Sequence, residues 1–160
     1  MEVGDLKMLS DFDLSDNNIS GSIPSSLGGC ASLSRLSLKG NLFQGMIPPS
    51  LSSLKGLVEL DISHNNLSGQ IPPFLEQLRL TNLNLSYNDF EGELPMLGVF
   101  GNASAFSIFG NSRLCGGLVE LRLPKCNEMK KHKKKVTFVC NCHFDCIYTF
   151  HYNMFGIRLV

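Results

Sequence analysis

The sequence predicts a right-handed solenoid of α/β type, in which short strands form a parallel sheet on the concave side and irregular or 3-10 segments form the convex side. Two observations predict this fold. One pattern of leucine, asparagine, glycine and proline returns at a nearly constant interval, and apolar and polar residues alternate within each copy of it. The 160 residues suit one modest domain, and a composition of 43% hydrophobic and 18% charged residues is that of a folding chain.

The repeat has four copies, which are FDLSDNNISGSIP, LSLKGNLFQGMIP, LDISHNNLSGQIP and LNLSYNDFEGELP. Their asparagines recur at spacings of 24, 24 and 23 residues, and one glycine and one proline keep the same intervals. Chance similarity does not hold one spacing across four residue types, so the chain contains structural repeats. The aligned positions are Asn17, Asn41, Asn65 and Asn88; Gly21, Gly45, Gly69 and Gly92; and Pro24, Pro48, Pro72 and Pro95.

The third copy shows how each unit is expected to fold. The stretch LVELDIS has the period of two of a strand with one buried face. Leu57, Leu60 and Ile62 are predicted to point inward, and Val58, Glu59, Asp61 and Ser63 outward.

The residues after this strand are predicted to turn the chain and close the coil. The Asn65 amide is expected to bond backbone groups of its own and neighbouring coils. Gly69 permits a turn, and Pro72, which lacks an N–H, fits an edge or a turn. The second half of each unit, PPSLSSLKG in the preceding one, is predicted to close the core from the back, there with Leu51 and Leu54. One unit cannot bury its own leucines, so stability requires stacking, for which four units are just sufficient.

The unit LxxLxLxxNxLxGxIPxxL resembles the plant-specific leucine-rich repeat. The segment from NLNLSYNDF to LRLPKCN is similar to the membrane-proximal end of plant receptor-like kinase ectodomains of the immune-receptor type. The resemblance implies three regions: leucine-rich repeats over residues 1–98, a C-terminal cap over 99–129, and a basic segment with an irregular tail over 130–160. It also implies a location on the extracellular side of the plasma membrane, as part of a longer receptor.

Both ends of the chain depart from the plan of that family. The chain starts inside a repeat, and Glu2 and Asp5 interrupt the region where a secretion signal would need an apolar run. The sequence contains no Gly-rich nucleotide loop, no HRD-type catalytic loop and no DFG, so kinase activity and bound cofactors are not expected. His64 shares a strand face with Asp61, but no nucleophile is placed to complete a catalytic triad.

Two cysteines follow the last repeat, where an exposed end of the core must be covered. The family resemblance implies a disulfide between Cys115 and Cys126, and two buried thiols are the alternative. Cys30 occupies a leucine position and is predicted to be a small core residue. Sequons for N-glycosylation occur at Asn18, Asn66, Asn84 and Asn102, although NNLSG also suits the turn geometry of the repeat.

The outward strand positions form the best candidate for a binding surface, because the fold aligns one side chain per coil. Solvated charges at such positions commonly serve only solubility. The resemblance implies contact with a peptide or protein ligand and with a co-receptor kinase ectodomain, for which His64, Asn84 and Tyr87 are the first candidates. The full predicted set is Asp13, Arg35, Lys39, Glu59, Asp61, His64, Asn84 and Tyr87.

The formal net charge of zero conceals a difference between two parts of the chain. Residues 1–129 hold 8 basic and 13 acidic residues, whereas residues 130–160 hold 6 basic and 1 acidic. Five of the lysines lie in Lys130–Lys135, where the resembling receptors carry a basic juxtamembrane segment. No aromatic residue interleaves with them, so nucleic acid is not an expected partner.

The segment after this basic run has the features of neither a membrane anchor nor a metal site. Polar and charged residues interrupt it, so no convincing transmembrane helix follows. Cys140, Cys142, His143, Cys146 and His151 lack the spacing of ordinary zinc sites, so no metal is expected. The function predicted for the whole chain is therefore a non-catalytic interaction module in defence signalling. A secreted inhibitor of microbial cell-wall hydrolases and a truncated gene product are the alternatives.

Overall fold

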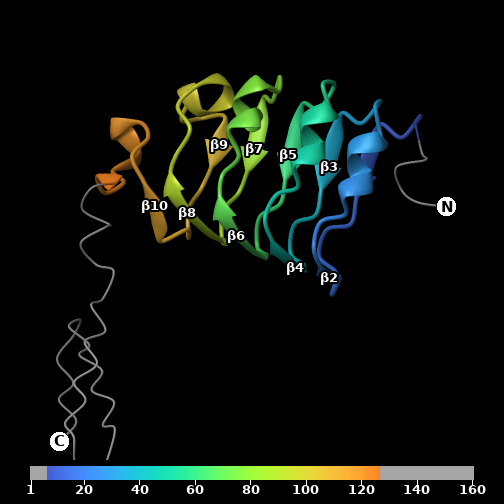
Figure 1. Ribbon diagram of the computed structural model, residues 1–160, viewed down its shortest axis with the longest axis horizontal. Helices are drawn as coiled ribbons and strands as arrows, with labels where there is room; N and C mark the ends of the chain where they lie inside the picture. The colour runs from blue at the N-terminus through green and yellow to red at the C-terminus, as the bar shows by residue number, and fades with distance from the viewer. Residues whose placement is uncertain (1–6, 127–160) are drawn as a thin grey trace, which may run out of the picture.

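The computed structural model describes residues 7–126, which form a stack of coils (Figure 1). Each coil adds one strand to each of two parallel sheets, and both sheets have five strands. The first sheet is the one that the sequence predicts. Its order is β1 (Asp11–Asp13), β3 (Arg35–Ser37), β5 (Glu59–Asp61), β7 (Asn82–Asn84) and β9 (Phe106–Ser107).

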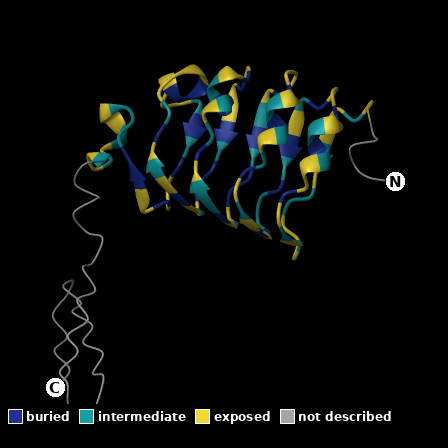
Figure 2. Ribbon diagram, viewed as in Figure 1, coloured by how far each residue is buried: buried dark blue, intermediate teal, exposed yellow. Residues whose placement is uncertain are grey.

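The register of the first sheet stacks one apolar side chain per coil toward the core. Its partners across the coils are Phe12, Leu36, Leu60, Leu83 and Phe106. The three leucines are no more than 1% exposed, whereas Phe12, on the edge strand β1, is half-buried. The inward positions predicted for the third repeat are confirmed, because Leu57, Leu60 and Ile62 are buried. Figure 2 shows this buried band along the strands.

The second sheet was not predicted. It is formed by the residues that follow each asparagine, in the order β10 (Arg113–Cys115), β8 (Asp89–Glu93), β6 (Asn66–Gln70), β4 (Leu42–Gly45) and β2 (Ser20–Gly21). Gly69, expected in a turn, lies in β6 with φ 82°, a value that favours glycine. The positive φ therefore occurs within a strand, where the sequence predicted a turn.

The side opposite the first sheet consists of short 3-10 turns, as predicted. They are η2 (Ser25–Gly29), η3 (Pro49–Ser53), η4 (Pro73–Gln77), η5 (Gly98–Gly101) and η6 (Val119–Leu121). Pro24, Pro48 and Pro72 immediately precede the first three turns in extended conformation, where no backbone donor is needed. Each of these turns buries one leucine, which closes the core from the back.

The asparagines bond neighbouring coils, as predicted. Asn65 Nδ2 donates to the carbonyl of Leu38 in the preceding coil at 2.9 Å and to the carbonyls of Ile62 and Ser63 in its own coil. Its Oδ1 accepts the Phe43 N–H of the preceding coil at 3.0 Å. Asn41 and Asn88 repeat this pattern. This set of side chains, with Asn17 and Asn111, is called the asparagine ladder below.

The segment after residue 98, assigned to the cap from the sequence, adds a fifth coil. Asn111 lies 23 residues after Asn88, donates to the Leu85 carbonyl and accepts the Phe90 N–H. The chain then closes in a disulfide between Cys115 and Cys126. The structure therefore contains the bridge that the family resemblance implied.

Two individual predictions have different outcomes. Ser63 was expected to face outward, which is wrong: it is completely buried, and its N–H and hydroxyl both donate to Asp61 Oδ1. Cys30 is completely buried, as predicted for a core residue, and burial raises the pKa of its thiol. Within residues 7–126, no helix is long and apolar enough to cross a membrane. The predictions for Lys130–Lys135 and for the segment after it lie outside the described residues.

Candidate interaction surface

The outward face of the first sheet aligns polar side chains into two rows. Register places Asp11, Arg35, Glu59 and Asn82 side by side in one row, and Asp13, Ser37, Asp61, Asn84 and Ser107 in the other. In the first row, acidic, basic, acidic and uncharged residues therefore follow one another from coil to coil. This face has no single sign of charge, which favours a mixed polar partner over a polyanion or a polycation.

Three of the predicted binding residues also have a local structural role. Asp13 and Asp61 each accept the N–H and the hydroxyl of the serine two positions later, and Asn84 accepts the same two groups from Ser86. These contacts fix the end of each strand. The hydroxyl and N–H of Ser15 hold the pKa of the Asp13 carboxyl below its ordinary value. Only part of each side chain is therefore available to a partner.

One surface ion pair joins the second and third coils. Arg35 Nε lies 3.2 Å from Glu59 Oε2, and both side chains are more than 40% exposed. Such a surface ion pair contributes little to stability, about 1 kcal/mol or less. Both groups can therefore exchange this contact for one with a partner at small cost.

A further row lies just beyond the strand ends, immediately before the asparagine ladder. Its members have positive φ, with values of 53° at His64 and 54° at Tyr87. The equivalent residues in other coils are Asp16, Gly40 and Gly110, which also have positive φ. Glycine adopts this conformation without strain, whereas the other residues, and Tyr above all, adopt it at a cost. His64 and Tyr87 are the two members of the row with large polar rings.

The rings of His64 and Tyr87 form a continuous exposed patch with the ring of Phe109, the residue before Gly110. The His64 and Tyr87 rings stack with centroids 4.3 Å apart, and the Phe109 ring meets Tyr87 edge-on at 5.6 Å. Tyr87 is 47% exposed and Phe109 is 71% exposed. These three side chains are called the aromatic row below. Exposed aromatic rings supply much contact area with few rotatable bonds, which is why they dominate the binding energy of many interfaces.

The structure thus brings together only part of the predicted set. His64 and Tyr87 touch each other, and Arg35 pairs with Glu59. Lys39 lies beyond the end of β3 and belongs to neither pair. Phe109 was missed. Its signal was available, because it precedes Asn111 by two residues, and Asn111 continues the ladder spacings of 24, 24 and 23 with a further 23.

The four sequons lie in different settings. Asn18 and Asn66 flank or begin strands of the second sheet and are exposed. Asn102 is exposed after η5, and its Oδ1 accepts the Ser104 N–H. Asn84 lies in β7, and its Nδ2 is 3.3 Å from Asp61 Oδ2.

A family model described as Leucine Rich Repeat matches residues 8–30, 32–54, 56–78 and 79–98, more than half of the chain. The chain belongs to the leucine-rich-repeat family. The four matched segments coincide with the first four coils, each holding one asparagine of the ladder. The fifth coil lies outside the matched residues.

Among curated proteins, this leucine-rich-repeat chain is similar to a probable LRR receptor-like serine/threonine-protein kinase of Arabidopsis thaliana. The identity is 42% over 63 residues, which cover 36% of this chain and 6% of the relative. It is also 49% identical over 38 residues to the receptor kinase-like protein Xa21 of Oryza sativa subsp. japonica, covering 24% of this chain and 4% of that protein. The matches thus span a small fraction of these receptors.

One solved structure similar to this chain is that of the Arabidopsis receptor kinase HAESA in complex with the peptide hormone IDA and the co-receptor SERK1. Its TM-score is 0.65 and its identity 41%, covering 72% of this chain and 19% of that one. The LRR ectodomain of the Arabidopsis receptor kinase SOBIR1 matches with a TM-score of 0.64 and 38% identity, over 70% of this chain and 62% of that one. The fold is therefore that of plant receptor-kinase ectodomains.

Proposed function

We propose that this chain is a non-catalytic protein-interaction module of the plant receptor-kinase type, which binds the ectodomain of a co-receptor kinase through its C-terminal coils. The observation that carries the proposal is the aromatic row, which leaves two large rings exposed beside the polar rows of the first sheet. A peptide ligand is expected on the same face, along the row of outward strand residues.

The proposed location is the extracellular side of the plasma membrane. The disulfide between Cys115 and Cys126 supports it, because such bonds persist in oxidising compartments and are rare in the cytosol. The similarity to receptor kinases supports it as well.

Calorimetric titration of the full, oxidised chain with the LRR ectodomain of a SERK-type co-receptor tests the proposal. Binding in the micromolar range is expected. Phe109→Ala and Tyr87→Asn should each weaken it by about tenfold or more, as expected for residues at the centre of an interface. Asparagine is chosen at position 87 because it tolerates the positive φ that the backbone keeps there.

Leu42→Ala is the matched control. Leu42 is 58% exposed, comparable to Phe109, but lies on β4 of the second sheet. Its removal should leave the affinity unchanged. The proposal fails if no heat of binding is detected, or if Leu42→Ala weakens binding as much as Phe109→Ala does.

A further inference from the structure

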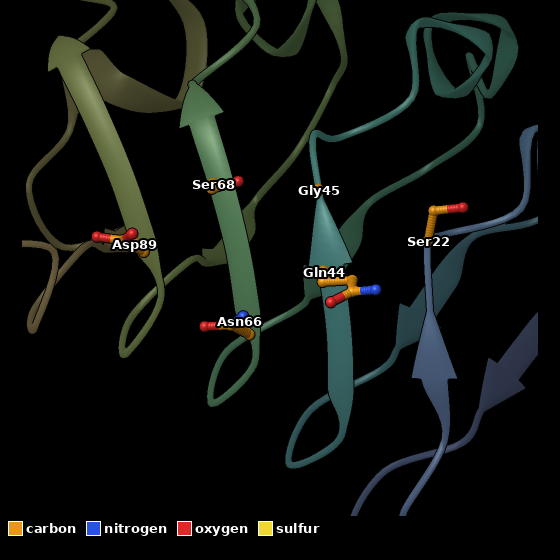
Figure 3. A pocket seen from close by; sticks show the side chains of 6 residues that line it. All are labelled: Ser22, Gln44, Gly45, Asn66, Ser68 and Asp89. Carbon is orange, nitrogen blue, oxygen red and sulfur yellow. The ribbon is translucent and has the colours of Figure 1, made fainter.

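The second sheet carries an open, polar hollow of about 510 Å³ that plays no part in the proposed function (Figure 3). The register of the sheet builds it, because Gln44 lies beside Asn66, and Ser68 lies beside Asp89, on adjacent strands. Glycine and polar side chains line it, with no apolar side chain among them. The lining residues are Ser22, Gln44, Gly45, Asn66, Ser68 and Asp89. Such a lining suits a ligand rich in hydroxyl and amide groups.

Asn66 and Ser68 are the first and third residues of a sequon within β6, Asn66-Leu67-Ser68. Leu67 between them is completely buried, so the two polar side chains project together on the outer side of the strand. Asn66 is exposed, and among the described residues its amide forms no hydrogen bond with protein. Its neighbour Asn65 uses the amide for four such bonds. The ladder therefore needs Asn65 and makes no use of Asn66.

At the other sequons, an asparagine amide without a hydrogen bond and a polar hollow beside it do not occur together. Asn84 Oδ1 accepts two bonds from Ser86, and its Nδ2 approaches Asp61. Asn18 and Asn102 are exposed but do not line the hollow. The hollow thus distinguishes Asn66 from three positions that the sequence pattern alone treats alike.

We infer that Asn66 carries an N-linked oligosaccharide whose first N-acetylglucosamine lies in this hollow, hydrogen-bonded to Gln44 and Ser68. In the transfer, Asn66 Nδ2 forms a bond to C1 of the sugar. The bond from C1 to the diphosphate of the lipid-linked oligosaccharide donor breaks, the lipid diphosphate leaves, and the amide loses one proton. At Gly45, the neighbouring position on β4, an added Cβ would meet nothing within 4 Å, which leaves room for a sugar ring.

Occupancy is tested on the full chain, secreted from insect cells behind a heterologous secretion signal, so that the result does not depend on the location proposed above. Peptide mapping by mass spectrometry should find a high-mannose glycan on Asn66. Asn66→Gln and Ser68→Ala should each abolish it, and Ser68→Thr should retain it because threonine preserves the sequon. Secreted protein with unmodified Asn66 overturns the inference, whatever the state of Asn102.

The position of the first N-acetylglucosamine in the hollow is tested on the folded glycoprotein, with an endoglycosidase that cleaves after that sugar. One net hydrogen bond to that sugar should slow release from Asn66 by about fivefold relative to release after denaturation. Gln44→Ala should remove most of that protection. Gln70→Ala is the control, because Gln70 is exposed on β6, the strand that carries Asn66, but does not line the hollow. Equal rates in the folded and denatured protein, or no effect of Gln44→Ala, overturn the seating of the sugar.

Discussion

Replacing Asn65 with alanine tests whether the asparagine ladder holds the coils together. The Asn65 side chain forms four hydrogen bonds of 2.9–3.2 Å, three donated to carbonyls and one accepted from the Phe43 N–H. The three carbonyls each keep another donor: Leu38 keeps Asn41, Ile62 keeps Asn88, and Ser63 keeps the Gly40 N–H. The Phe43 N–H loses the acceptor that Asn65 supplied.

The free energy of unfolding should fall by about 2.5–4.5 kcal/mol. An orphaned buried donor costs about 1–3 kcal/mol, and each lost bond to a carbonyl that keeps another donor costs about 0.5 kcal/mol. Urea unfolding of the full, oxidised chain, followed by circular dichroism, measures the change. With a slope of about 2 kcal/mol/M, the midpoint should move down by about 1–2 M.

Asn17→Ala is the matched control, since Asn17 opens the ladder with no described coil before it. Its Nδ2 donates to the carbonyls of Leu14 and Ser15, both within its own coil, and the side chain is exposed. Its loss should cost about 1 kcal/mol or less. If Asn17→Ala destabilises the chain as much as Asn65→Ala does, the bonds between coils are not the source of the stability. A transition without cooperativity in the unmodified chain would refute the stacking argument itself.

Two further predictions concern the ends of the stack. Replacing Cys115 and Cys126 together with serine opens a loop with a sequence separation of 11, which should lower the free energy of unfolding by about 3 kcal/mol. Hydrogen exchange should show the loss of protection concentrated in β8 and β10, and uniform loss along the chain would contradict a capping role. At the other end, the lowered pKa of Asp13 implies stability that is present above the unfolded-state pKa and is lost as the pH falls through the folded-state pKa, below about pH 4. Asp13→Asn should keep the bonds to Ser15, as Asn84 does with Ser86, so its unfolding midpoint should fall less between neutral pH and about pH 3 than that of the unmodified chain. Equal acid sensitivity of the two proteins would exclude Asp13 as a source of the stability lost at low pH.

Periodicity was enough to predict the ladder and the first sheet. Asn41, Asn65 and Asn88 each need the same backbone partners, so the structural requirement appears directly as a spacing in the sequence. The same holds for Leu36, Leu60 and Leu83, which stack in register. Where one residue type satisfies one contact in every coil, the sequence alone predicts the contact.

The second sheet escaped prediction because its strands have unfavourable composition. The strand β6 consists of NLSGQ, and asparagine and glycine are depleted in strands. Its pairing comes from the stacking of coils, which brings each segment beside the next whatever its intrinsic preference. Tertiary placement overrides propensity here, and Gly69 accommodates it with a positive φ.

Of the aromatic row, the sequence predicted His64 and Tyr87 as contact residues but not Phe109, nor the conformation that aligns the rings. The position before each ladder asparagine is Asp, Gly, His, Tyr or Gly, so no single residue type marks it. What recurs is the backbone conformation, with φ between 53° and 84° at all five positions. Sequence patterns report conserved chemistry between repeats, and this position repeats only in geometry.

That geometry connects the stability of the fold to the proposed function. His64 and Tyr87 each immediately precede a ladder asparagine, and their N–H groups bond the carbonyls of Ser86 and Phe109 in the next coil. The ladder and these bonds together hold the two rings at positive φ, a conformation that neither residue prefers. Rings held by the stack are presented to a partner with little remaining freedom, so less conformational entropy is lost on binding. The contacts that hold the coils together therefore also hold His64 and Tyr87 in a strained backbone conformation, and the result is a preorganised aromatic surface.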